Sequence, residues 1–340
     1  MRIITSIDEA LIGRLRADRE FFWLDLTGPD AEQVERLGGL LGLHALAVED
    51  SVDFGQRPKL DHYGRTALLV LEGGVELKKA ERRRPLEEIH CYISGEYIVT
   101  LHRRPYAELK HLATLLETAT PSKTEQYYVY RVIDAIVDSY FPILASLDEE
   151  INRLEDAIVA RVRGRQLEEI FRLKRLLLRL RKAVVPMRDV FAREIETIAD
   201  LAGLETESHD YFRDVYDHLI RITDELDSYH EMVSSCTDLY LSTIANRQGE
   251  ISKQLTVIAS VFLPLTFLTG FFGMNFGWEV DHIDSGWAFL VFGLGTMVVS
   301  AAVMWWWFHR KGWTHADGDD ARPSRIKGRD GGDDQRSKAG

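Results

Sequence analysis

Two uncharged apolar segments near the C-terminus constrain this 340-residue chain more than any other feature. Residues 254–273 and residues 286–308 contain no Asp, Glu, Lys or Arg, and residues 274–285 join them. A helix needs about 20 apolar residues to cross the hydrocarbon core of a bilayer. We therefore expect an integral membrane protein with two C-terminal transmembrane helices, the first at 254–273 and the second at 286–308.

The charges around these segments predict their orientation. Arg247 and Lys253 precede the first segment, and Arg310 and Lys311 follow the second, whereas the connecting loop has no Lys or Arg. Because positive residues mark the cytoplasmic side, we expect both termini in the cytoplasm of a multi-pass protein of the cell (inner) membrane. The N-terminus lacks the long apolar core of a signal peptide, which also predicts a cytoplasmic location for the first 250 or so residues.

The loop at 274–285 is then extracytoplasmic, and its charged residues are acidic. They are Glu279, Asp281 and Asp284. A group of carboxylates raises the local concentration of cations, so we expect this loop to attract divalent ions from outside.

Composition excludes several classes of function. The formal net charge of −12 argues against a nucleic-acid partner, because binding to phosphates needs clustered positive charge. Cys91 and Cys236 form no CxxC pair and are expected to be buried, reduced thiols. The sequence contains no phosphate loop, nucleophile elbow or metalloprotease motif, so we predict neither an enzyme nor an organic cofactor.

The N-terminal 253 residues divide into two predicted parts. Residues 1–120 read as a cytosolic α/β domain with a mixed sheet, because strand signals at 21–26, 66–77, 88–94 and 97–101 alternate with helical signals at 31–41 and 106–119. Residues 121–253 read as a stalk of long helices. We expect helices at 125–163 and 167–201, then one from near Ser208 into the first span. We expect the tail, 309–340, to begin with a basic segment that anchors the second span and to be disordered after it.

The last of these helices would have about 60 residues and be about 90 Å long at the α-helical rise. With only two spans in each chain, a pore requires several copies, which predicts a symmetric ring. One face of the first span presents small, apolar or weakly polar residues at intervals of four, four, three and four: Leu255, Ala259, Leu263, Thr266 and Gly270. Such a face suits either close helix packing or a pore lining.

Asn275 follows Gly273 and Met274 where the first span ends. In a ring of identical chains, its amides would converge on the axis. Mg2+ loses its water shell reluctantly, so neutral amides could hydrogen-bond to the hydrated ion without removing that shell. The alternative is that Asn275 and Gly273 simply cap the helix.

The chain resembles the CorA-type magnesium transporter family, within the superfamily of two-span metal ion transporters. The resemblance covers about residues 40–313 and rests on a set of local motifs. These are Gly273-Met274-Asn275, residues 255–259, residues 262–266, residues 211–218, residues 238–242, Gln56-Arg57-Pro58-Lys59 and the basic pair Arg310-Lys311. The resemblance implies a homopentamer with a funnel-shaped cytosolic domain that conducts Mg2+, and often Co2+ or Ni2+, through a pore lined by the first span.

The resemblance also implies roles for particular residues. Gly273, Met274 and Asn275 would form the selectivity filter. Thr266 and Gly270 would be further pore positions, with Ala259 on the same face. Leu255 and Leu263 would form the hydrophobic constriction, and Asp238 would be an acidic pore position on the cytoplasmic side.

The resemblance further implies a regulatory Mg2+ site between subunits. Asp214 would supply one carboxylate, and Glu76 is the nearest candidate on the neighbouring copy. A solvated or ion-paired carboxylate is the alternative for Asp214.

Two alternative functions stay open. The family often follows its filter with a Met-Pro-Glu-Leu type of loop, which is absent here, and His282 lies beside Asp281 in that loop. Imidazole suits zinc better than magnesium, so a zinc transporter of the same superfamily is one alternative. The other is a two-span sensor that conducts no ions.

Overall fold

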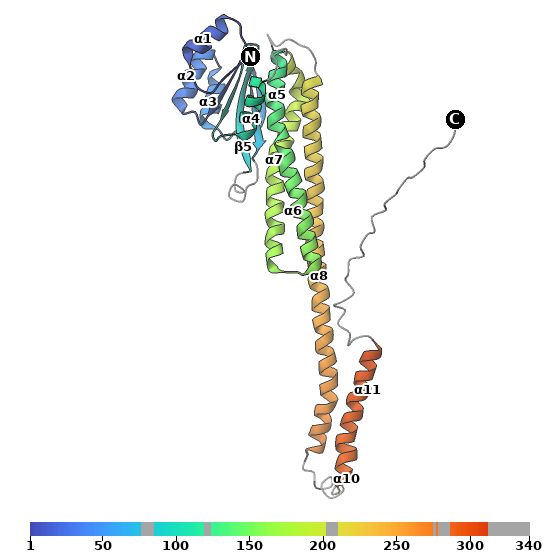
Figure 1. The fold of residues 1–340 in the computed structure, drawn as a ribbon. Helices are drawn as coiled ribbons and strands as arrows, with labels where there is room; N and C mark the ends of the chain where they lie inside the picture. Colours follow the sequence, from blue (N-terminus) through green and yellow to red (C-terminus); the bar gives the residue numbers. More distant parts are fainter. Residues whose placement is uncertain (76–84, 119–123, 202–209, 275–276, 278–285, 312–340) are drawn as a thin grey trace, which may run out of the picture. The chain divides into compact units, whose positions relative to one another are not determined.

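The computed structural model describes residues 1–75, 85–118, 124–201, 210–274, 277 and 286–311 (Figure 1). The chain divides into two compact units, Met1–Thr243 and Ile244–Gly340. One helix, α8 (Asp210–Phe272), contributes residues to both units. The predicted combination of a mixed sheet, long helices and two apolar C-terminal helices is present.

The first unit contains a six-stranded sheet in the order β1-β2-β6-β5-β4-β3. Its strands are β1 (Arg2–Ile4), β2 (Phe22–Thr27), β3 (Lys59–Tyr63), β4 (Thr66–Gly74), β5 (Leu86–Ser94) and β6 (Tyr97–His102). The pairs β1–β2 and β2–β6 are parallel, and the remaining neighbours are antiparallel, which confirms the predicted mixed sheet.

Helices cover both faces of this sheet (Figure 1). On one face lie α1 (Glu9–Ala17), α2 (Ala31–Leu41) and α3 (Ala45–Asp53); α4 (Ala107–Thr118) and the long helices lie on the other. Alternate residues of β2 enter the two cores, with Trp23 on the side of the long helices and Phe22 and Leu24 on the other. Strands β2, β4 and β6 are therefore mostly apolar, because they are buried on both sides, whereas β1 and β3 at the two edges of the sheet are only partly buried.

The long helices are α5 (Glu125–Asp138), α6 (Tyr140–Ala160), α7 (Gly164–Ala199) and the first part of α8. The prediction of one helix over 125–163 is wrong, because the chain turns at Ser139 and leaves the helix after Ala160. Pro142 has no N–H to donate to the carbonyl of Asp138, which weakens the helix at this point. The Ser139 hydroxyl instead accepts a hydrogen bond of 2.7 Å from the N–H of Gly74, at the end of β4.

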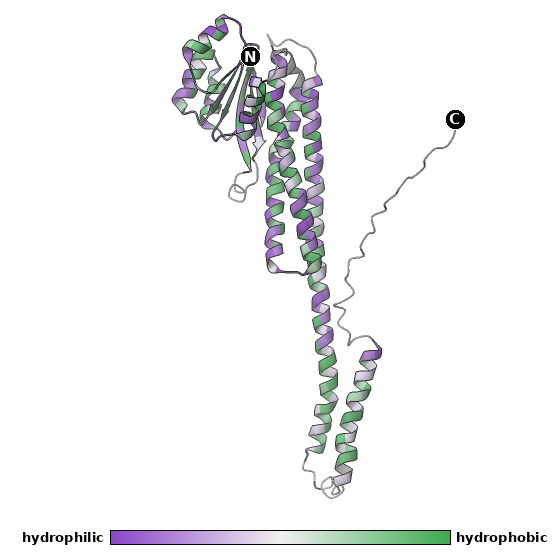
Figure 2. Ribbon diagram, in the orientation of Figure 1, coloured by the Kyte–Doolittle hydropathy of each residue, from purple (hydrophilic) through white to green (hydrophobic). Residues whose placement is uncertain are grey.

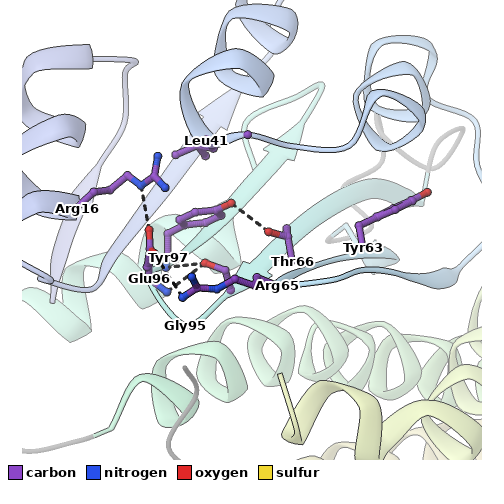
Figure 3. Close-up of a pocket in the computed structure, with 10 residues that line it drawn as sticks. Arg16, Leu41, Tyr63, Arg65, Thr66, Gly95, Glu96 and Tyr97 are labelled. Atoms are coloured by element: carbon purple, nitrogen blue, oxygen red, sulfur yellow. Dashed lines mark hydrogen bonds and ion pairs between the residues drawn. The ribbon is translucent and has the colours of Figure 1, made fainter. Parts of the chain in front are cut away.

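A polar cavity of about 210 Å³ lies where two tight hairpin turns approach the ends of α1 and α2 (Figure 3). In it the Arg16 guanidinium donates to the Glu96 carboxylate at 2.9 Å, and Arg65 lies 3.9 Å from the same carboxylate. The two hairpins are also joined by the hydroxyls of Thr66 and Tyr97, which lie 3.5 Å apart. These contacts fix the turns of β3–β4 and β5–β6 beside each other.

The second unit contains the last part of α8, followed by α10 (Gly286–Ala288), a π-helical segment (Phe289–Gly295) and α11 (Thr296–Arg310). Asp210–Phe272 and Leu290–Arg310 are long and apolar enough to cross a membrane. Hydrophobic residues dominate α11 and the last part of α8, whereas the long helices before them carry both hydrophilic and hydrophobic residues along their length (Figure 2). Next to the end of α11, Arg310 lies over the Trp306 ring at 5.3 Å and Lys311 over Trp307 at 4.5 Å.

Gly74→Ala should destabilise the protein, because the junction of β4 with α5 and α6 has no room for a methyl group. A Cβ at Gly74 would lie 2.7 Å from Ile143 Cδ1 and 2.9 Å from the Ser139 carbonyl oxygen. Relief of this overlap requires a backbone shift that costs about 1–3 kcal/mol. The measurement is the melting temperature of the purified full-length protein, with Gly39→Ala as control. Gly39 is exposed in α2 with open space around it, so its substitution should be neutral or stabilising. Equal melting temperatures for Gly74→Ala and the unaltered protein would contradict the assignment.

Candidate functional site

Three carboxylates and one imidazole lie together where α5 contacts α8. Asp134 and Asp138 are one turn apart on α5, and Asp214 and His218 are one turn apart on α8. Side chains four residues apart share a helix face, so each helix presents two of these groups. The Nδ1 atom of His218 lies 2.9 Å from Asp138 Oδ1 and 3.5 Å from Asp134 Oδ1, and its Nε2 atom lies 3.9 Å from Asp214 Oδ1. We call these four residues the α5–α8 cluster.

Burial shapes the electrostatics of the cluster. Asp134 is 5% exposed, and burial together with the nearby Asp138 raises the pKa of its carboxyl to about 6, against the opposing charges of His218 and Arg131. Burial also raises the pKa of Asp138. The carboxylates outnumber the positive groups that face them, since Arg131 lies 3.7 Å from Asp134 and His218 carries charge only when protonated. The cluster therefore favours an added cation.

The ligand atoms of Asp134, Asp138 and His218 suit a metal ion. They lie within 4.8 Å of one another. Asp134 Oδ1, Asp138 Oδ1 and His218 Nδ1 are buried, and among the described residues none has a partner with hydrogen-bond geometry, although their ion-pair distances are short. Buried polar atoms without hydrogen bonds are rare and call for an explanation such as a bound ion or water. Carboxylate oxygens suit Mg2+, and the imidazole nitrogen suits Co2+, Ni2+ or Zn2+.

Asp214 connects this cluster to the surface, because its carboxylate is half exposed. The hydroxyl of Tyr130 donates to Asp214 Oδ2 at 2.9 Å, and the Tyr130 ring stacks on Tyr211 with centroids 4.9 Å apart. Burial and the Asp214 charge raise the pKa of Tyr130, so this hydroxyl keeps its proton at neutral pH. One oxygen of Asp214 is thus held by Tyr130 while the other faces His218. Glu76, the predicted partner of Asp214, lies outside the described residues.

The predicted pore positions share the exposed side of the last part of α8. Leu255 and Leu263 are 62% and 75% exposed, and Ala259, Thr266 and Gly270 are exposed as well. A second face of the same segment is half buried; its residues include Val257, Pro264, Leu268 and Phe272. The structure therefore places the five positions on one side of the helix, and their pore-lining role stays a prediction. Asp238 is exposed on the earlier part of α8.

The helix ends at the first residues of the predicted filter. The N–H of Gly273 donates to the Thr269 carbonyl at 3.0 Å, and the N–H of Met274 donates to Phe271 at 3.2 Å. A Cβ at Gly273 would lie 2.9 Å from the Thr269 oxygen, so this tight ending suits glycine. Met274 is exposed. Asn275 and the acidic loop residues Glu279, Asp281 and Asp284 lie outside the described residues.

A sequence profile of the CorA-like Mg2+ transporter proteins matches residues 18–310. The chain belongs to this family. The cobalt/magnesium transport protein CorA of Thermotoga maritima is 32% identical over 295 residues, which cover 86% of this chain and 83% of that protein. The zinc transport protein ZntB of Photorhabdus laumondii is 26% identical over 260 residues, or 76% of this chain and 77% of that protein.

A solved structure of the CorA magnesium transporter from Methanocaldococcus jannaschii shares the fold. Its TM-score is 0.74 at 22% identity, and the match covers 86% of this chain and 90% of the other. This likeness confirms the predicted fold class, in which an N-terminal α/β part, long helices and two C-terminal apolar helices follow one another.

Sequence reasoning missed three members of the cluster. Asp134 and Asp138 lie within the apolar repeat of the predicted stalk, and His218 closes the run 211–218, but of these four residues only Asp214 was expected to bind metal. The available signal was a pair of ligand-type residues four apart on each of two helices: Asp134 with Asp138, and Asp214 with His218. That spacing does not show which two helices pack together, so it could not predict that the two pairs would meet.

Metal binding at the α5–α8 cluster should weaken in acid. A metal ion needs ionised carboxylates, so Asp134, with a pKa of about 6, has to lose its proton before it can bind. The rise in melting temperature caused by Co2+ or Mg2+ should therefore be larger at about pH 7.5 than at about pH 5.5. Asp134→Asn should reduce the rise at the higher pH. Asp224→Asn serves as control, because Asp224 is exposed on α8 outside the cluster. A metal-induced rise that is equal at both pH values and in both variants would refute the site.

Proposed function

We propose that the chain forms a homopentameric channel that carries divalent cations, Mg2+ foremost and also Co2+ and Ni2+, into the cell. The observation that carries the proposal is membership of the CorA-like Mg2+ transporter family over residues 18–310, a range that contains both apolar helices and Gly273-Met274-Asn275. The Thermotoga maritima relative, named as a cobalt/magnesium transport protein, supports this choice of ions. Both termini lie in the cytoplasm, and the second apolar helix faces the lipid bilayer.

The pore consists of the exposed side of the last part of α8 from each subunit. Leu255 and Leu263 narrow it with apolar side chains, and Thr266 and Gly270 line it nearer the outer end. A ring of Asn275 amides selects hydrated divalent ions that the acidic loop has concentrated. The membrane potential drives entry with about 2.3 kcal/mol per charge per 100 mV, which is doubled for a divalent ion.

Cytosolic Mg2+ regulates this pore through Asp214. Mg2+ held between Asp214 and Glu76 of a neighbouring copy favours a closed ring. When the ion leaves, the carboxylates repel one another, and the crowding of Asp134, Asp138 and Asp214 adds to this repulsion. The feedback is a difference in Mg2+ affinity between two states of the ring.

A zinc transporter is the second candidate, and two observations favour it. The ZntB relative covers three quarters of the chain, and the α5–α8 cluster contains an imidazole nitrogen within ligand distance of two carboxylates. Imidazole binds zinc better than magnesium. Uptake of Mg2+ and Zn2+ by the same proteoliposomes, with and without a proton gradient, separates the two candidates.

Asn275→Ala should abolish selective Mg2+ uptake in proteoliposomes, because the ring loses the amides that hydrogen-bond to the ion's water shell. We expect a fall of roughly tenfold or more, comparable to the loss of one or more hydrogen bonds to a charged group. Asn152→Ala is the matched control, since Asn152 is an exposed asparagine of α6. Uptake by Asn275→Ala equal to that of the unaltered protein would refute the filter assignment. Uptake of no divalent cation by the unaltered protein would instead favour the sensor alternative.

Asp214→Ala should weaken inhibition by internal Mg2+ while uptake itself persists. Removal of one carboxylate of the regulatory site should raise the half-inhibitory Mg2+ concentration by about fivefold or more, the lower end of typical allosteric couplings. Asp224→Ala provides the control on the same helix. The measurement is the initial rate of uptake into vesicles preloaded with graded Mg2+. An inhibition curve that is unchanged in Asp214→Ala would show that the carboxylate has no regulatory role.

A further inference from the structure

A second cavity, of about 570 Å³, lies between α7 and the loop that leads into β3. None of its lining residues belongs to the α5–α8 cluster or to the predicted pore. The loop carries Gln56-Arg57-Pro58-Lys59, one of the motifs on which the family resemblance rests, and to which neither the pore nor the regulatory site gives a role. Ligand cavities in proteins commonly measure about 300–1,000 Å³, so this one is large enough for a small organic molecule.

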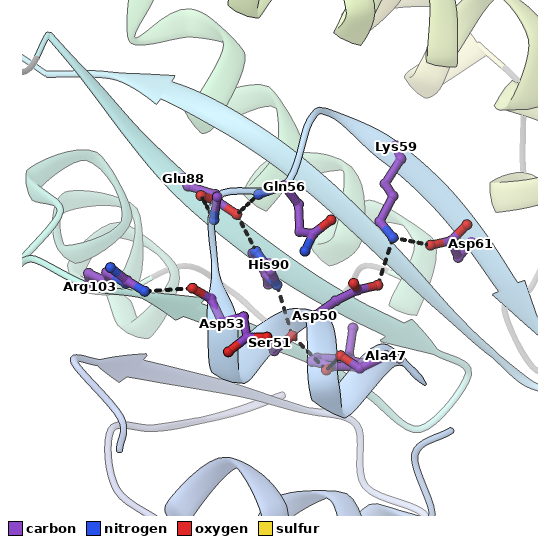
Figure 4. A network of polar contacts seen from close by, with 12 residues as sticks. Ala47, Asp50, Ser51, Asp53, Gln56, Lys59, Asp61, Glu88, His90 and Arg103 are labelled. Carbon is purple, nitrogen blue, oxygen red and sulfur yellow. Dashed lines mark hydrogen bonds and ion pairs between the residues drawn. The ribbon is translucent and has the colours of Figure 1, made fainter. Parts of the chain in front are cut away.

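Hydrogen bonds to the Glu88 carboxylate hold the start of this loop, and its two basic residues have different surroundings (Figure 4). The Glu88 carboxylate accepts hydrogen bonds from the N–H groups of Gly55 and Gln56 at 2.6 and 2.8 Å. Lys59 is engaged internally, because its ammonium lies 2.6 Å from Asp50 and 2.7 Å from Asp61. Arg57 is exposed, lines the cavity and forms no ion pair with any described residue. Of the two basic side chains in the motif, Arg57 is therefore the one that has no ion pair among the described residues and that lines the cavity.

The opposite wall, on α7, is strongly basic. Arg181 and Lys182 line the cavity. Arg181 also pairs with Asp227 at 3.2 Å in an exposed contact, whereas Lys182 has no ion pair within the part of the chain that the structure describes. Between residues 170 and 188 the helix contains seven basic residues and no acidic one: Arg172, Lys174, Arg175, Arg179, Arg181, Lys182 and Arg188. Arg172, Arg181 and Arg188 pair with the carboxylates of Glu150, Asp227 and Asp189, so the positive charge that can attract an anion to the cavity lies mainly on Lys182 and on Arg57 of the loop.

The rest of the lining is apolar with two hydrogen-bond acceptors. Pro58, Leu178 and Val185 supply apolar surface. The Glu72 carboxyl also lines the cavity, and burial, with a contribution from Glu88, raises its pKa. Pro186 lies inside the continuous helix α7 and has no N–H, so the carbonyl of Lys182, one turn earlier, lacks its usual helical donor. An occupant should therefore combine negative charge, an apolar face and N–H or O–H donors.

We propose that this cavity binds a nucleotide, a molecule that combines these three properties. Its phosphates contact Arg57, Arg181 and Lys182, since guanidinium and ammonium groups form charge-assisted hydrogen bonds with phosphate oxygens. Its planar base packs against Leu178 and the neighbouring prolines. The exocyclic amino group or the ribose hydroxyls donate to the Glu72 carboxyl and to the free carbonyl of Lys182.

The test is calorimetric titration of the full-length protein in detergent with ATP, in buffer containing EDTA. The chelator removes divalent ions, so the result does not depend on ion transport or on the regulatory metal site. Tripolyphosphate and adenosine are titrated separately, to distinguish recognition of phosphate alone from recognition of the whole nucleotide. We expect saturable ATP binding that is about tenfold tighter than that of either fragment, since each fragment loses a set of contacts.

Arg57→Ala and Lys182→Ala should each weaken ATP binding by about tenfold, the loss expected for one charge-assisted hydrogen bond. Both residues are exposed, and Lys182→Arg, which keeps the charge, should retain binding. Arg175→Ala is the matched control, because Arg175 is an exposed basic residue of α7 that does not line the cavity. The proposal is overturned by absence of saturable ATP binding, by tripolyphosphate binding as tightly as ATP, or by equal ATP affinities in Arg57→Ala, Lys182→Ala and Arg175→Ala.

Discussion

Helix α8 has to be stable in two different solvents, and the remainder of the chain is arranged around that requirement. In its first part, one stripe of residues such as Phe212, Leu219 and Leu226 is buried in a core shared with α5, α6 and α7. In its last part, residues 254–272 are predominantly apolar and carry no charged side chain on any side, as hydrocarbon requires. Apart from the break in hydrogen bonding at Pro264, the helix pairs its own backbone groups, which permits the same secondary structure in both settings. A helix of 63 residues also needs neighbours, and α5, α6 and α7 provide them for its first part.

Elements with strong periodicity could be predicted from the sequence, whereas short ones could not. Helix α2 was predicted with its observed bounds, because its apolar positions repeat at helical spacing; in the structure Asp30 caps its start. Strands β1 and β3 were missed, since β1 has three residues and β3, with Asp61 and His62, lacks an apolar alternation. The predicted strand 66–77 extends beyond β4, which ends at Gly74. There the N–H of Gly74 donates a hydrogen bond to the Ser139 hydroxyl. The spans followed from composition alone, but the α5–α8 cluster depends on which helices pack together, and that is a tertiary property.

The α5–α8 cluster and the end of β4 are joined through one residue. Ser139 follows Asp138 directly, and its hydroxyl holds the N–H of Gly74, so β4 ends beside the cluster. Tyr140 strengthens this junction by donating to the Glu72 carbonyl at 2.7 Å. The break between α5 and α6 therefore allows Ser139, the residue after Asp138, to form a hydrogen bond with the end of β4. A ligand-induced shift of Asp138 would be transmitted to the strand through this hydrogen bond, and not only along the helices.

The π-helical segment at Phe289–Gly295 changes how the second span should be read. A π turn takes up one more residue than an α turn, so the residues before and after it are out of phase by about 100°. A helical wheel drawn without a break from Gly286 to Arg310 would therefore assign lipid-facing and protein-facing sides wrongly for one end. Only Gly286–Ala288 precede the π segment, so the sides of this span should be assigned from the phase of Thr296–Arg310 and not extended back through Gly293 and Gly295.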